Sequence, residues 1–155
     1  MELKEINSLV ELFFKKFEQI TSEDLKKREK TFLVSLKAKI KYDNFLYSSY
    51  TWGAINTRIK VLSNYLINII SKGDRCILLS ENRPEWLISD IAIMNAGGVT
   101  VPLFTTYSES DYKYIIKDCE PKVCMISDNE QFKKIKNHIK DETILISIEK
   151  FDENI

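Results

Sequence analysis

The stretch KGDRCILLSENRPEW, residues 72–86, decides the fold of this chain. Residues 76–79 are a short apolar run without alternation, which is typical of a strand covered on both faces in a parallel sheet. Pro84 suits the first turn of a helix, where its missing N–H would have no partner anyway. Trp86 begins an apolar stripe at helical spacing, and we expect this side chain to be part of the core. Because Gly97-Gly98 ends the helix and an apolar run follows it at 99–104, the stretch predicts a strand–helix–strand unit.

The same alternation continues toward the C-terminus. Ser108 and Asp111 form a capping signature for a helix through residue 119. Strands are expected at 123–126 and 143–148, with a Lys-rich helix at 129–139 between them. Four strands alternating with three helices predict an α/β fold, as a partial doubly wound and mostly parallel sheet with flanking helices.

The first fifty residues have a different pattern. Ser8 and Glu11 read as a capping box, in which each side chain bonds the backbone N–H of the other residue, before an apolar stripe that predicts a helix over 9–20. Two β-prone runs, 32–35 and 45–50, flank a polar turn, so that a hairpin is the expected arrangement.

A long helix is expected after this hairpin. Thr51 can cap it, and the apolar residues from Ile55 to Ile69 recur at helical spacing up to Ser71.

Composition excludes several classes of protein. The chain has 155 residues, 23 basic and 23 acidic, so it lacks the basic excess of a nucleic-acid binder. It has neither an apolar signal core at the N-terminus nor an apolar stretch of membrane-spanning length, which predicts a cytoplasmic protein. Phe13 and Phe17 in the first helix leave peripheral membrane contact open as an alternative to packing within the domain.

The cysteines and the histidine do not indicate a metal site. Cys76, Cys119 and Cys124 lack the spacing of zinc ligands, and burial as small apolar side chains is the expected role. His138 is the only histidine and lies in the Lys-rich segment, where we expect it to be exposed.

Ligands of open α/β sheets bind at the carboxyl ends of the strands, which here are residues 80–83, 104–107 and 127–128. Arg83 could meet an anion or could simply be a surface residue, and Thr105, Thr106 and Tyr107 offer hydroxyls. Asp90 and Asp118 have no spacing that indicates acid–base catalysis. We therefore assign no catalytic, cofactor-binding or metal-binding residue.

The run KGDRCILLSENRPEWLISDIAIMNAGGVTVPLFTTYS resembles the adenylate-forming acyl-CoA synthetases, and most closely their long-chain fatty acid branch. The resemblance extends back through YTWGAINTRIKVLSNYLINIISKGD and forward through YKYIIKDCEPKVCMISDN, and covers roughly residues 47–150. It implies an AMP-forming ligase of fatty acid metabolism, in which fatty acid and ATP give an acyl-adenylate and CoA then displaces AMP. ATP, CoA and Mg²⁺ are the implied cofactors.

The family's catalytic motifs are missing from this sequence. They are a Ser/Thr/Gly-rich loop ending in Pro-Lys-Gly, a Tyr-Gly-x-Thr-Glu segment, a ribose-binding Asp and a C-terminal lysine. The resemblance therefore implies that residues 1–155 are an incomplete N-terminal AMP-binding domain, with a helix and hairpin in 1–50 and α/β units in 51–155. We expect this chain alone to be inactive.

Two alternatives remain. The chain could come from another acyl-adenylate-forming ligase, or it could be a non-catalytic remnant that binds a partner through an unfinished sheet. The implied partners are a fatty acid for the whole enzyme, and a second copy or a downstream ligase segment for this chain. A nucleic acid is not expected.

Overall fold

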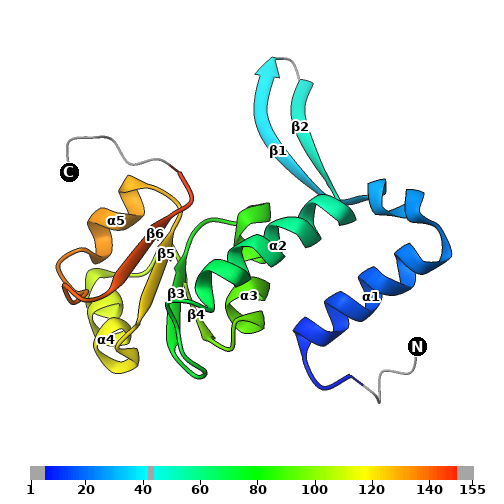
Figure 1. The fold of residues 1–155 in the computed structure, drawn as a ribbon. Coiled ribbons are helices and arrows are strands. Elements are labelled where there is room, and N and C mark those ends of the chain that lie inside the picture. Colours follow the sequence, from blue (N-terminus) through cyan, green and yellow to red (C-terminus); the bar gives the residue numbers. More distant parts are fainter. Residues whose placement is uncertain (1–5, 42–43, 150–155) are drawn as a thin grey trace. The chain divides into compact units, whose positions relative to one another are not determined.

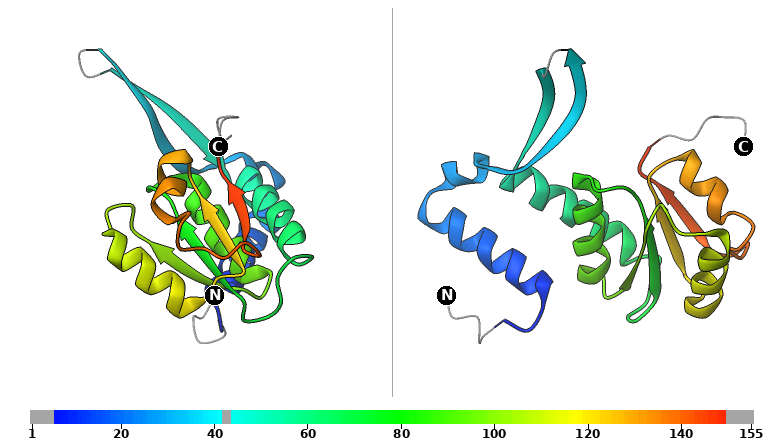
Figure 2. Two further views of the ribbon diagram at one scale, coloured as in Figure 1. Left: turned by 90° about the vertical axis from the view of Figure 1, so that its left-hand side faces the viewer. Right: turned by 180° about the vertical axis from the view of Figure 1, so that it is seen from behind.

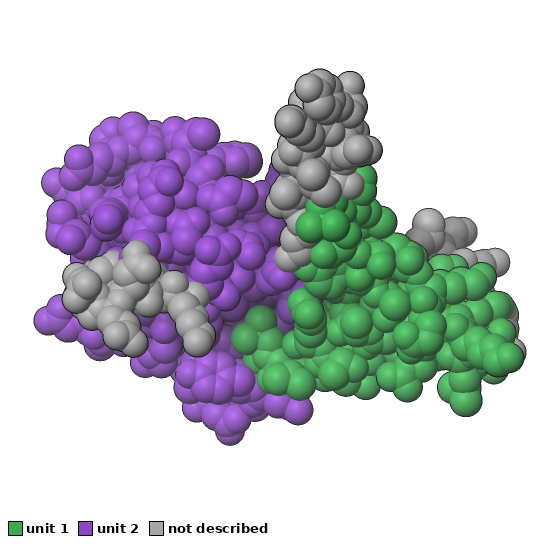
Figure 3. Space-filling model, turned by 90° about the horizontal axis from the view of Figure 1, so that it is seen from above, with its two compact units in different colours: residues 1–62 green, residues 63–155 purple. Residues whose placement is uncertain are grey.

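The computed structural model describes residues 6–41 and 44–149. Its contacts separate two compact units, residues 1–62 and residues 63–155, which Figure 3 shows in different colours.

The first unit contains a helix, a short 3-10 helix, a hairpin and most of a second helix. Helix α1 (Leu9–Glu23) confirms the predicted helix and extends it by three residues, and the short 3-10 helix η2 (Leu25–Glu29) follows. Strands β1 (Thr31–Lys41) and β2 (Asn44–Thr51) pair antiparallel, which confirms the expected hairpin, while the centre of its predicted turn lies outside the described residues. Helix α2 (Trp52–Leu66) follows directly and ends five residues before the predicted Ser71.

The caps of α1 and α2 are largely as predicted. The Ser8 hydroxyl accepts the Glu11 N–H at 3.0 Å, and the Thr51 hydroxyl accepts the Ala54 N–H at 3.1 Å. The Glu11 carboxylate, however, accepts the N–H of Asn7 at 2.9 Å and not that of Ser8. The hydrogen bond from Lys15, followed by that from Asn7, lowers the pKa of Glu11.

Aromatic side chains hold the first unit together. The ring of Phe32 lies 3.9 Å from that of Trp52 between centroids, and Phe13 lies 6.0 Å and 5.8 Å from the two. Phe13 is only 6% exposed. The apolar stripe of α1 therefore uses Phe13 to pack against its own unit.

The second unit is a parallel α/β sheet. Its strands are β3 (Arg75–Leu79), β4 (Val99–Leu103), β5 (Val123–Ile126) and β6 (Ile144–Ser147), in the order β4-β3-β5-β6. Between them lie α3 (Pro84–Asn95), α4 (Glu109–Cys119) and α5 (Asn129–Ile135), as Figure 1 shows. The predicted α/β class is correct.

Helices cover both faces of this sheet. Helix α3 lies on one face, while α4 and α5 lie on the other, which is visible from two sides in Figures 1 and 2. On the α4/α5 face the buried cluster consists of Ile77, Leu79, Leu103, Tyr112, Ile116, Cys124, Ile126 and Ile135. Alternate residues such as Leu78 and Met125 pair in register and point to the opposite face. Burial on both faces explains why the strands lack an alternating pattern.

The expectation for Trp86 is wrong. Its side chain is half-buried, and the buried face of α3 is formed by Ile88, Ile91 and Ala92. The face therefore lies further round the helix than the aromatic residue suggests. Helix α5 likewise ends at Ile135, four residues before its predicted end.

Arg75 and Pro102 each account for backbone groups that would otherwise lack a hydrogen-bond partner. Arg75 donates from Nε to the carbonyl of Cys119 at 2.7 Å and from a terminal nitrogen to that of Glu120 at 3.2 Å. This satisfies carbonyls at the C-terminus of α4, where Glu120 adopts φ +41°. Pro102 lies in β4, the strand at one edge of the sheet, where a missing N–H is tolerated.

The cysteines are free, as expected for small buried side chains: Cys76 and Cys124 are buried and Cys119 is half-buried. Burial raises the pKa of Cys76 to about 11 and that of Cys124 to about 12.

We therefore expect a single thiol to react with iodoacetamide in the folded chain at pH 8. A thiol with a pKa near 11 is only about one part in a thousand thiolate at that pH, and the thiolate is the nucleophile. Cys119 should react at least about tenfold faster than the other two because it is partly accessible. Peptide mass spectrometry after timed labelling measures this, with a urea-unfolded sample as the control in which all three react. Equal rates in the folded chain would contradict the assignment.

Candidate functional site

The three segments in which a ligand was expected lie together at the carboxyl ends of the strands. The strands are parallel, so the segments 80–83, 104–107 and 127–128 all follow strand ends on the same side. Strands β3 and β5 are neighbours, yet their helices α3 and α5 lie on opposite faces. The chain reverses its winding between these two strands, which is where open α/β sheets place their ligand crevice.

Side chains of the protein itself occupy this crevice. Gln131, 3% exposed, donates its amide to the Glu81 carboxylate at 2.9 Å and joins the ends of β3 and β5. The buried Ser127 hydroxyl donates to Asp128 at 3.1 Å, and the Asp128 carboxylate also accepts the N–H of Gln131 at 3.0 Å. The polar groups at this point are thus engaged in internal hydrogen bonds.

Arg83, the candidate for meeting an anion, is engaged by carboxylates. Its Nε lies 3.0 Å from Glu85, and a terminal nitrogen lies 2.7 Å from Glu149. Burial alone would lower the pKa of Arg83, but the hydrogen bonds to Glu149 and Glu85 outweigh it and raise the pKa. The positive charge of Arg83 is therefore balanced by two carboxylates of the same chain, which favours the alternative of a surface residue over capture of an anion.

The N-termini of the helices at this edge also carry acidic caps. In α4 the Ser108 hydroxyl accepts the Asp111 N–H at 3.3 Å, and the Asp111 carboxylate accepts the Ser108 N–H at 3.0 Å, which confirms the predicted signature. The hydrogen bonds from Ser108 lower the pKa of Asp111. In α5 the N-cap residue is itself acidic, since the Asp128 carboxylate accepts the Gln131 N–H, and Glu85 occupies the first turn of α3. Because these negative charges stand where a phosphate would bind, the described residues do not fit the triphosphate of ATP.

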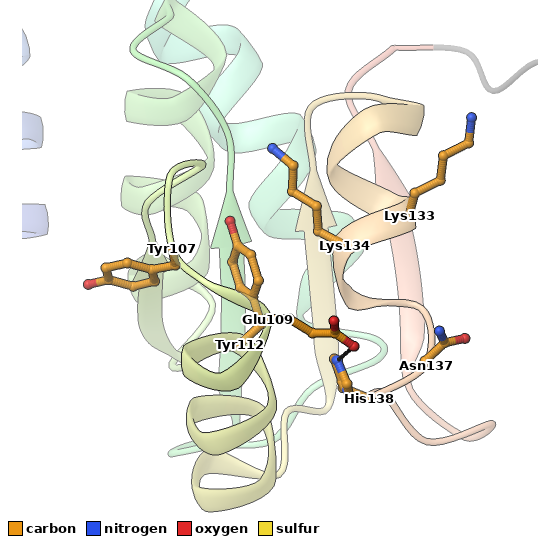
Figure 4. A pocket seen from close by; sticks show the side chains of 7 residues that line it. All are labelled: Tyr107, Glu109, Tyr112, Lys133, Lys134, Asn137 and His138. Carbon is orange, nitrogen blue, oxygen red and sulfur yellow. Dashed lines mark ion pairs between the residues drawn. The ribbon is translucent and has the colours of Figure 1, made fainter.

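A pocket of about 350 Å³ lies beside this edge, between α4 and α5. Figure 4 shows its lining residues, which are Tyr107, Glu109, Tyr112, Lys133, Lys134, Asn137 and His138. Only Tyr107 was a candidate for this edge from the sequence. The other lining residues lie on α4, on α5 or just beyond α5, and they come together only through the packing of these segments on the sheet. Of the three loop residues that offered hydroxyls, Tyr107 is the one that lines the pocket.

His138 differs from its expectation. Its side chain is 12% exposed, and its Nε2 lies 3.6 Å from the Glu109 carboxylate. The residue lies beyond the end of α5 at Ile135, so the chain turns and brings the imidazole toward the start of α4. The expectation of an exposed histidine rested on a helix that was too long.

Asp90 and Asp118 do not form a pair. Asp90 lies on α3 and Asp118 on α4, and these helices cover opposite faces of the sheet.

Within residues 6–41 and 44–149, no group of three or more His, Cys, Asp or Glu side chains could hold a metal ion. The helices in these ranges are also too short or too polar to cross a bilayer.

Comparison with protein families identifies the chain. The profile described as "AMP-binding enzyme" matches residues 23–154, most of the sequence. The chain belongs to the AMP-binding enzyme family. The resemblance carried by residues 47–150 is thereby confirmed at the level of the family.

Curated relatives of this chain are named as fatty acid–CoA ligases or fatty acyl-CoA synthetases. Long-chain-fatty-acid–CoA ligase FadD15 of Mycobacterium bovis is 32% identical over 48% of this chain and 13% of the relative. Fatty acyl-CoA synthetase A of Dictyostelium discoideum is 33% identical over 58% of this chain and 13% of the relative. Long-chain-fatty-acid–CoA ligase ACSBG1 of Rattus norvegicus is 29% identical over 70% and 14%. The chain therefore spans about a seventh of the length of these relatives.

Solved structures agree with the fold. The ATP-bound MatB of Rhodopseudomonas palustris has 26% identity and a TM-score of 0.58, over 65% of this chain and 20% of that protein. VinN, at 15% identity, has a TM-score of 0.66 over 91% of this chain and 32% of that protein, which supports the fold alone.

Proposed function

We propose that this AMP-binding enzyme chain forms the first α/β part of the large domain of a long-chain fatty acid–CoA ligase. The observation that carries the proposal is the family match over residues 23–154, together with the names of the relatives. In this proposal residues 1–155 are an incomplete N-terminal AMP-binding domain, which works in the cytoplasm on a fatty acid. Its residues build the sheet and helices on which the catalytic elements of the complete enzyme rest.

The cofactors follow from the same proposal. ATP with Mg²⁺ would supply the adenylyl group, and CoA would accept the acyl group. The described residues do not fit the triphosphate, since acidic caps occupy the helix N-termini at the sheet edge. We accordingly derive no chemical step at these residues. They contribute position, through the hydrogen bonds that fix the strand ends relative to one another.

A chimera tests this function. We expect the chain to replace the corresponding segment of FadD15 from Mycobacterium tuberculosis, which is 32% identical to it over 76 residues, and to keep long-chain activity. The measurement is exchange of labelled pyrophosphate into ATP that depends on palmitate. The matched control is the same chimera with Leu78→Asp, which places a charge in the central strand and should abolish folding. A chimera that folds by circular dichroism but shows no exchange would contradict the proposal.

The acid specificity has one alternative with support. A relative from Metallosphaera sedula is named 4-hydroxybutyrate–CoA ligase 2 and is 30% identical over 64% of this chain and 19% of that protein. Placing the chain in the corresponding segment of this ligase as well, and measuring exchange with 4-hydroxybutyrate, separates the two. Activity in this second chimera but not in the FadD15 chimera would favour the second candidate.

A further inference from the structure

The loop that follows β4 is held by its backbone from two sides. The Tyr112 hydroxyl, on α4, donates to the carbonyl of Phe104 at 2.8 Å. The Lys134 ammonium, on α5, donates to the next carbonyl, that of Thr105, at 3.0 Å. Figure 4 shows the two side-chain heads converging on this loop from the two helices that flank the pocket.

We propose that Tyr112 and Lys134 are positioning residues that lock the loop 104–107 as a rigid wall of the pocket. Two consecutive peptide carbonyls are each hydrogen-bonded to a different helix. The backbone of the loop therefore cannot move away from one helix without breaking a hydrogen bond to the other. The rest of its backbone agrees, because the Tyr107 N–H also donates to the Phe104 carbonyl at 3.2 Å.

The chemistry of both groups suits a permanent lock. Burial raises the pKa of Tyr112, so the phenol stays protonated and keeps donating at neutral pH. Lys134 is itself oriented by Gln131, whose amide oxygen accepts from the ammonium at 3.0 Å, and by Glu130 at 3.3 Å. Hydrogen bonds from a charged donor are among the stronger ones in proteins.

The locked loop presents aromatic rings. Phe104 is 68% exposed although it is a large apolar side chain, and its ring meets that of Tyr107 edge-on at 5.3 Å. The centroid of the Tyr107 ring lies 6.1 Å from that of the Tyr112 ring. Exposed flat rings suit stacking against a planar base, and of the two implied nucleotides CoA is the one that remains, because the acidic first turns at this edge do not fit the triphosphate of ATP. This assignment to a substrate rests on the proposed function; the lock itself does not.

Amide hydrogen exchange in the 155-residue chain tests the lock. Tyr112→Phe and Lys134→Met should each speed exchange of the Tyr107 amide by about tenfold, because each removes one tether of the loop. Lys133→Met is the matched control: it makes the same change in charge at the adjacent, exposed residue and should leave this amide unchanged. Lys134→Arg should restore much of the protection because it can still donate. Thermal unfolding by circular dichroism verifies that the variants stay folded.

Steady-state kinetics of the chimera test the role in positioning. Lys134→Met should raise the KM for CoA by about tenfold, while kcat and the KM values for ATP and the fatty acid change little. A rise in the KM for ATP instead would overturn the assignment to CoA. Lys117→Met, an exposed change on α4, is the control.

The outcomes are separable. Unchanged exchange of the Tyr107 amide in both variants would overturn the lock. Faster exchange with all KM values unchanged would overturn the positioning role. An inactive chimera would count against the proposed function only, since the exchange measurements on the chain would still decide the lock.

Discussion

Replacing Leu78 with alanine should lower the free energy of unfolding of the α/β unit by about 2–5 kcal/mol, the usual cost of removing a large side chain from a closed core. Leu78 is fully buried in β3, which is paired with β4 on one side and with β5 on the other. Its partners in register, Pro102 and Met125, belong to two different strands, so backbone movement cannot readily fill the cavity.

The slowest amides of β3 and β5 report this free energy by hydrogen exchange, without a contribution from the first unit. Val99→Ala is the matched control, since Val99 lies on the edge strand β4 and is exposed. It should cost less than about 1 kcal/mol. Equal effects of the two substitutions would mean that β3 is not the centre of this core.

The isolated chain should catalyse no palmitate-dependent exchange of pyrophosphate into ATP. Losing a single transition-state donor typically costs about a hundred- to a thousandfold in rate, and several are missing here. Arg83 cannot substitute, because Glu85 and Glu149 already balance its charge. We expect the rate to equal that of a heat-denatured sample.

The control for this assay is intact FadD15 measured in parallel. Exchange by the purified chain above the denatured sample would refute the incomplete-domain proposal. It would also require a nucleotide site among the described residues, and the pocket beside Tyr107 would be the first place to substitute.

The helices and strands that could be predicted from the sequence are those determined by residues close together in the chain. The strands and helices from β3 to β5 depend on apolar runs, on Pro84, on Gly97 and on the cap at Ser108, all of which act within a few residues. The strand order could not be predicted, because pairing of β3 with both β4 and β5 joins segments that are far apart in sequence.

The pocket was missed for the same reason. It depends on where α5 ends, and the Lys-rich pattern continues past Ile135 without marking that end. The pairing of Arg83 with Glu149 spans 66 positions and leaves no trace in the local sequence. For Trp86 the local signal was misleading. Its large apolar side chain predicted the wrong buried face of α3, which smaller side chains form instead.

Pro102 limits how this sheet can grow. Fibres formed by strand addition need two open edges, one at each end of the repeating molecule. Within the described residues, the sheet has its edges at β4 and β6, and proline in β4 withholds a donor from any incoming strand. Only β6 offers an uninterrupted ladder. Edge-to-edge association through this sheet therefore favours a two-fold pair, β6 against β6, over a filament.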